Sequence, residues 1–78
     1  MNWQHDRAQA MIGAQEELAF IIDTMTGALP LDPFNGDWQC FSRYCAMQAD
    51  SMKRCGFNHL ADVAQAYANR AARKRGAA

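Results

Sequence analysis

Apolar residues recur every three or four positions in the first third of the chain. One stripe with this spacing consists of Met11, Ala14, Leu18, Ile21 and Met25. A second stripe beside it consists of Ala8, Ile12, Ala19 and Ile22. Together they predict a helix with a wide apolar face over residues 3–26, which Gly27 ends and Pro30 keeps from resuming. Gly13 costs this helix about 1 kcal/mol relative to alanine; it either permits the close approach of another helix or is simply tolerated.

The same periodicity predicts two more helices in the second half of the chain. One is expected over residues 37–55, with Asp37 as its N-cap and Gly56 at its end. Its apolar face consists of Trp38, Phe41, Cys45, Met52 and Cys55. Gln48 interrupts that face and is expected at the edge of the core. The last helix is expected over residues 58–74, with Asn58 as its N-cap. Its apolar face consists of Leu60, Val63, Ala64, Tyr67 and Ala71.

No strand pattern accompanies these helices, because alternating apolar and polar runs bounded by turns do not occur. We therefore expect an all-α fold, a small three-helix bundle in which residues 1–78 form a single domain. The short connection between the last two helices makes them a hairpin or a sharp corner.

The connection between the first two helices is unusually apolar for a loop that contains two prolines and two glycines. Its large apolar side chains are Leu29, Leu31, Phe34 and Trp38. One interpretation is that they fold back over the open end of the bundle, since exposed apolar patches are rare on monomers. The other is a partner-binding or dimer surface, because aromatic residues in a proline-stiffened loop lose little entropy on binding.

Charge is unevenly distributed although the chain as a whole is neutral. Residues 1–37 carry one basic residue and six acids, a net charge of −5, whereas residues 38–78 carry seven basic residues and two acids, a net charge of +5. Either the two halves pack together and pair their charges at the rim, or they form two surfaces for two kinds of partner.

Metal binding, secretion and catalysis are not expected. The three cysteines lie five and ten residues apart, which does not match structural zinc sites, so we expect no metal and no cofactor. No signal peptide or membrane span is apparent, and we expect a soluble cytoplasmic protein. Cys55 and His59 are the only close cysteine–histidine pair, and Gly56 lies between them. Without a phosphate loop, dinucleotide fingerprint or other catalytic motif, the chain is not expected to be an enzyme.

A basic cluster ends the third predicted helix and suggests an alternative function. It consists of Arg70, Arg73, Lys74 and Arg75. Positive charge there complements the helix dipole, but it could also bind phosphates in a nucleic-acid-binding regulator. Against that alternative, this helix offers Ala, Val and Tyr where polar side chains would be needed to read bases.

Elimination leaves an intracellular protein–protein interaction module, an inhibitor or adaptor that binds and blocks a partner. The expected partner-binding residues are Glu16, Glu17, Asp23, Asp32, Phe34 and Trp38. Acidic residues of this kind attract a basic partner surface over long range. In size and composition the chain is similar to the small helical inhibitors encoded by bacteriophages, such as anti-CRISPR proteins, and this analogy implies a host protein or nucleoprotein complex as the partner. The wide face of the first helix also offers a surface for a homodimer.

Overall fold

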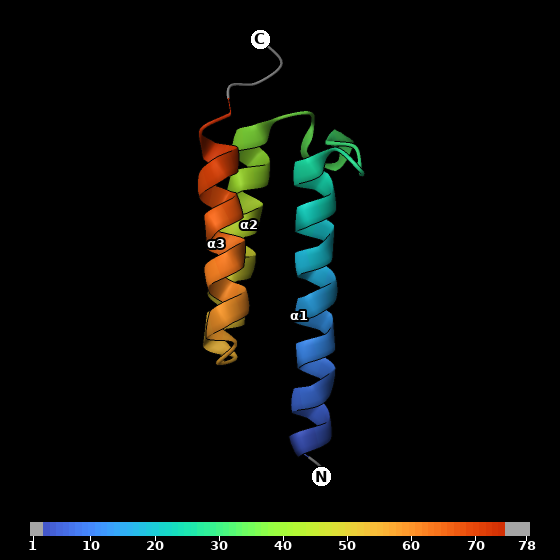
Figure 1. The fold of residues 1–78 in the computed structure, drawn as a ribbon, viewed down its shortest axis with the longest axis vertical. Coiled ribbons are helices and arrows are strands. Elements are labelled where there is room, and N and C mark those ends of the chain that lie inside the picture. The colour runs from blue at the N-terminus through green and yellow to red at the C-terminus, as the bar shows by residue number, and fades with distance from the viewer. Residues whose placement is uncertain (1–2, 75–78) are drawn as a thin grey trace.

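The computed structural model describes residues 3–74, and these residues form an all-α bundle of three helices (Figure 1). The helices are α1 (Trp3–Thr26), α2 (Trp38–Arg54) and α3 (Asn58–Ala72). A short 3₁₀ helix, η1 (Asp32–Phe34), interrupts the loop between α1 and α2 and was not expected. The predicted fold class is therefore confirmed, with the last helix ending two residues earlier than the sequence pattern indicates.

Glycine and aspartate set the helix boundaries largely as predicted. Gly27 follows α1 with a φ of +91°, and Gly56 follows α2 with a φ of +84°. Glycine adopts this left-handed conformation at little cost, which explains why both helices end there. Asp37 caps α2, because its Oδ1 accepts a hydrogen bond of 2.9 Å from the backbone N–H of Gln39.

The prediction that Asn58 caps α3 is wrong. Phe57 occupies the cap position, since its carbonyl accepts the first helical hydrogen bond from the N–H of Ala61 at 2.9 Å. No side chain caps this helix end. The ring of Phe57 is buried, so burial of an aromatic ring, rather than local capping chemistry, decides where α3 begins.

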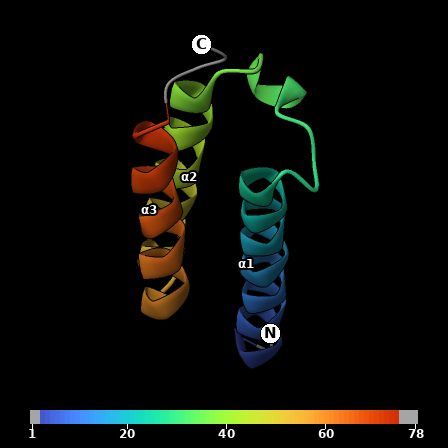
Figure 2. The ribbon, with the colours of Figure 1, turned by 45° about the horizontal axis from the view of Figure 1, so that its top comes forward.

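Helices α2 and α3 lie side by side as an antiparallel hairpin (Figures 1 and 2). The buried residues of α2 are Phe41, Cys45, Ala49 and Met52, and those of α3 are Ala61, Ala64, Ala68 and Ala71. Alanines spaced by three and four let the two backbones approach closely. Ser42 reaches across from α2, where its Oγ donates a hydrogen bond of 2.8 Å to the carbonyl of Ala68.

This close packing departs from the predicted apolar faces. Leu60 and Tyr67 are only partly buried at the margin of the core, whereas Ala61 and Ala68, which were not expected there, are buried. Cys55 was expected on the apolar face of α2 but is exposed, because it is the C-cap residue beyond the last buried turn.

Helix α1 runs beside the hairpin and uses only part of its wide apolar face. In the first stripe Ile21 and Met25 are buried, and the remaining residues pack partly buried against the core. In the second stripe Ala8, Ile12 and Ala19 stay exposed, Ile12 by 46%. A homodimer through this exposed stripe stays a prediction.

The apolar loop covers one end of the bundle. Phe34 is only 8% exposed, and its ring centroid lies 5.1 Å from those of Phe41 and Tyr44 and 6.2 Å from that of Phe20. Leu31 is partly buried against the same core. The interpretation of the loop as a cover is confirmed for these two residues, although Leu29 remains 37% exposed.

Candidate partner-binding groove

Two sets of contacts hold α1 against α2, and the first lies near the N-terminus of α1. The guanidinium of Arg7 donates a hydrogen bond from Nη1 to the carbonyl of Cys55 at 3.0 Å. The same group lies over the ring of Phe57, 5.0 Å from its centroid. This cation–π contact and hydrogen bond fasten α1 to the corner between α2 and α3.

The second set of contacts lies three turns further along α1. The hydroxyl of Tyr44 donates a hydrogen bond to Oε2 of Glu17. One turn on, the ring of Phe20 meets that of Tyr44 edge-on, with the centroids 6.0 Å apart. Glu17 is half-buried here. Its carboxylate is held in place by the hydroxyl of Tyr44, a neutral hydrogen-bond donor.

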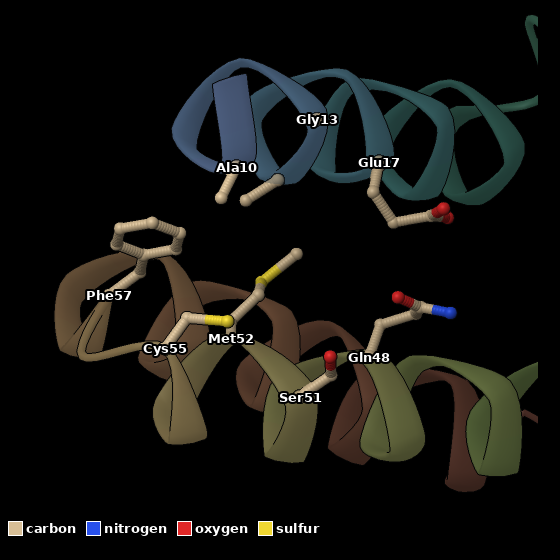
Figure 3. Close-up of a pocket in the computed structure, with 9 residues that line it drawn as sticks. Ala10, Gly13, Glu17, Gln48, Ser51, Met52, Cys55 and Phe57 are labelled. Carbon is tan, nitrogen blue, oxygen red and sulfur yellow. The ribbon is translucent and has the colours of Figure 1, made fainter. Parts of the chain in front are cut away.

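A groove of about 200 Å³ opens between these two sets of contacts (Figure 3). Its α1 wall consists of Ala10, Gly13, Ala14 and Glu17, and its α2 wall includes Gln48, Ser51 and Met52. The groove is open because the part of α1 between the two sets of contacts presents three small residues, Ala10, Gly13 and Ala14. A second, more open hollow is lined by Gly13 and Glu17 together with Glu16, Phe20 and Tyr44.

Gly13 faces open space. A Cβ atom placed on it would have no neighbour within 4 Å, so it does not serve the close approach of another helix. Its missing side chain instead leaves the groove wide beside Glu17. Gln48 is half-buried on the facing wall, and Figure 3 shows its amide and the carboxylate of Glu17 extending toward each other.

Burial and the charge of Glu17 keep two neighbouring groups neutral. Burial, together with the hydrogen bond to Glu17 and its charge, raises the pKa of the Tyr44 hydroxyl well above its ordinary value. Burial, with the negative charge of Glu17 as the second cause, raises the pKa of the Cys45 thiol to about 12. Glu17 lines the groove, and within residues 3–74 its carboxylate accepts one side-chain hydrogen bond, from Tyr44 to Oε2.

These shifts predict a loss of stability in alkaline solution. In the unfolded chain a thiol titrates at about pH 8.5 and a phenol at about pH 10. Because folding raises both pKa values, ionising either group costs more free energy in the folded protein than in the unfolded chain. The free energy of unfolding therefore has its full value at neutral pH and decreases as the pH rises from about 9 toward 12. Thermal unfolding followed by circular dichroism from neutral to alkaline pH should show a falling midpoint. The variants Tyr44→Phe and Cys45→Val should each reduce this slope, and a flat wild-type profile would contradict the assignment.

Three of the expected partner-binding acids, Glu16, Asp23 and Asp32, are exposed and form no ion pair with a lysine or arginine of residues 3–74. Glu16 and Asp23 are exposed on one side of α1, since seven residues make nearly two turns, and Asp32 is exposed on η1. Within residues 3–74, no lysine or arginine forms an ion pair with an acid of α1 or of the loop. The interpretation that the two halves pair their charges is therefore wrong for the described part of the chain.

The position of Asp23 is unfavourable to its own helix. It lies close to the C-terminus of α1, whose last turn holds no basic residue. A negative charge at this end opposes the helix dipole, at a typical cost of about 0.3–1 kcal/mol.

Two of the four basic residues of the alternative function lie over aromatic rings of the chain. The guanidinium of Arg70 lies 5.3 Å from the ring centroid of Tyr67, and Nζ of Lys74 lies 5.0 Å from that of Trp38. Arg73 is exposed as the C-cap of α3, and Arg75 lies outside the described residues.

The antiparallel hairpin also limits how far a basic surface can extend. Lys53 and Arg54 close α2 at the end where α3 begins, opposite Arg70. The structure therefore places Lys53 and Arg54 at the end of the hairpin away from Arg70, so these two residues do not extend the basic cluster of α3.

Two expected partner-binding residues also turn out to serve the fold. Phe34 is a core residue, and Trp38 is partly buried, packed on Phe41 at 5.9 Å and covered by Lys74. Phe34 is too deeply buried to act as an anchor, whereas Trp38 is only partly buried, and its contact with a partner stays a prediction. The sequence showed that these rings were available for burial, but it did not show whether the core or a partner would bury them.

No cluster of three or more histidine, cysteine or acidic side chains that could hold a metal ion is found in the part of the chain that the structure describes. The cysteines are free thiols, with Cys40 half-buried, Cys45 buried and Cys55 exposed. None of the described helices is long and apolar enough to cross a lipid bilayer.

Comparison with known proteins returned no match, whether to a family model, to a curated protein or to a solved structure. The class of this protein is therefore described by its fold alone, an all-α three-helix bundle with a groove between α1 and α2. Any functional conclusion rests on the arrangement of its charges and on this groove.

Proposed function

We propose that this protein is an interaction module whose acidic surface on α1 and η1 binds a basic surface of a partner protein. The observation that carries the proposal is the exposure of Glu16, Asp23 and Asp32 without any pairing to a lysine or arginine of the described chain. An uncompensated surface of one sign steers an oppositely charged partner and accelerates association.

The proposed role is that of an inhibitor or adaptor that covers a surface of its partner. The small size and the analogy with bacteriophage inhibitors support a host protein or nucleoprotein complex as that partner. A cytoplasmic location is part of the proposal, because three free thiols suit a reducing compartment. The contact set is revised from the sequence expectation, since Phe34 is a core residue and Glu17 lies in the groove.

Reversing two exposed acids should weaken binding to a basic probe. We expect the double variant Glu16→Lys/Asp23→Lys to bind a fluorescently labelled peptide of alternating arginine and glycine about tenfold more weakly than the wild type. Fluorescence anisotropy at low ionic strength measures this affinity. Helicity should be unchanged or slightly increased, because the Asp23 substitution relieves the unfavourable interaction with the helix dipole.

The matched control is Asp50→Lys/Asp62→Lys, which makes the same change in net charge on the other two helices. Both control positions are exposed. If the two double variants lose affinity equally, the effect is one of net charge alone and the acidic surface is not the binding site. Unchanged affinity in the α1 variant would also refute the proposal.

A further inference from the structure

The groove between α1 and α2 has the features of a site for one long cationic side chain. Its walls beside Gly13, Ala14 and Met52 are apolar, and its polar end is formed by Glu17 and Gln48 (Figure 3). Its volume of about 200 Å³ is below the range of about 300–1,000 Å³ typical of small-molecule pockets. One side chain of a partner is therefore a better match than a larger free ligand.

Glu17 is prepared to receive a hydrogen-bond donor. Its Oε2 accepts from the hydroxyl of Tyr44, and within residues 3–74 no side chain donates a hydrogen bond to Oε1. A carboxylate has about four lone-pair positions, so it can accept further hydrogen bonds. Because Tyr44 and the half-buried environment hold the carboxylate in place, little side-chain entropy remains to be lost when a donor arrives.

Charge within the groove favours one orientation of the incoming side chain. Arg7 lies beside the end formed by Cys55 and Phe57, where its guanidinium already contacts the ring of Phe57 and the carbonyl of Cys55. A second cation is repelled there and attracted toward Glu17. An anionic group would be repelled at the polar end by the same carboxylate.

We propose that this groove binds a single arginine side chain of the partner protein, with its guanidinium on Glu17. This inference rests on the proposed function, because it specifies how a basic partner is held. Arginine fits better than lysine because its planar fork can donate to a carboxylate and to a neighbouring amide oxygen at once, here Glu17 and Gln48. Its aliphatic stem would lie against Ala14 and Met52.

The test uses two small probes that differ in charge but hardly in shape, N-acetyl-arginine methylamide and N-acetyl-citrulline methylamide. With ¹⁵N-labelled protein, the arginine probe should shift the amide signals of Gly13 and Gln48 in a saturable way. The citrulline probe should bind about tenfold more weakly or not at all, because it lacks the charge-assisted hydrogen bond.

Two variants connect these shifts to the groove. Glu17→Gln removes the charge but keeps an acceptor for Tyr44, and it should weaken the arginine probe about tenfold. Gly13→Met should fill the groove and abolish the shift at Gln48. The fold should tolerate this change, because nothing lies within 4 Å of the added Cβ and methionine is the better helix former. Gln15→Met, at an exposed position of the same helix that does not line the groove, should bind like the wild type.

The inference is overturned if the arginine probe gives no saturable shifts up to its solubility limit, if citrulline binds equally, or if Gly13→Met binds like Gln15→Met. The proposed function fails separately, through the Glu16→Lys/Asp23→Lys measurement with the arginine–glycine peptide. If the acidic surface binds the partner but the groove stays empty, the wild type will bind the arginine–glycine peptide, and Gly13→Met will bind it with the same affinity.

Discussion

Replacing Phe34 by alanine is expected to destabilise the protein by about 3–4 kcal/mol, as for other buried phenylalanines. The ring is 8% exposed and contacts the rings of Phe20, Phe41 and Tyr44. Removing it leaves a cavity at the end of the bundle and also costs the edge-on and tilted ring contacts. Since a small domain is stable by only about 5–15 kcal/mol, a loss of this size is a large part of the total.

Urea unfolding followed by circular dichroism measures this effect. Phe34→Leu, which retains much of the buried apolar volume, should lose less than about 1.5 kcal/mol. Leu29→Ala, in the same loop at a more exposed position, should also lose less than Phe34→Ala. If Phe34→Ala unfolds at the same urea concentration as the wild type, the loop is not a cover for the core.

This burial also bears on the proposed function. The N–H of Phe34 donates to the carbonyl of Leu31 at 2.9 Å, and the N–H of Asn35 donates to that of Asp32 at 2.9 Å. The buried ring thereby anchors η1, and η1 presents the carboxylate of Asp32 at the surface. In the proposed interaction the loop would contribute through its exposed acid, Asp32, which the buried ring of Phe34 holds in position.

Replacing Ala64 by leucine is the second large effect that we expect, a destabilisation of about 1–3 kcal/mol. Ala64 is completely buried in the alanine stripe of α3. Three added carbon atoms would have to force α2 and α3 apart. That separation would also strain the hydrogen bond from Ser42 to the carbonyl of Ala68, so the damage should extend along the hairpin.

The control for this substitution is Ala66→Leu, on the same helix at an exposed position. It adds the same atoms where they meet solvent, and it should change stability by no more than about 0.5 kcal/mol. Urea unfolding of both variants gives the comparison. An equal effect at the two positions would show that helix propensity, rather than the close helix contact, governs the result.

The amino-acid sequence by itself determined the elements of this fold that depend on local chemistry. The spacing of apolar residues predicted three helices, and Gly27, Asp37 and Gly56 marked their boundaries within about two residues. These features are readable because a helix turn, a cap and a left-handed glycine each involve residues only a few positions apart.

Only the tertiary structure decided which apolar residues lie between helices. Phe57 replaced Asn58 as the cap of α3 because its ring is buried. Ala61 and Ala68 entered the core because α2 and α3 approach closely, a distance that helical periodicity does not specify.

The candidate site likewise depends on contacts between distant segments. Glu17 and Tyr44 are 27 positions apart in the chain. Only the folded structure shows that no lysine or arginine of residues 3–74 forms an ion pair with an acid of α1, and that Arg70 and Lys74 lie beside Tyr67 and Trp38. A sequence shows which charges and small residues are available. Whether a charge is compensated, or a glycine faces a helix or an open groove, depends on what the folded chain places opposite it.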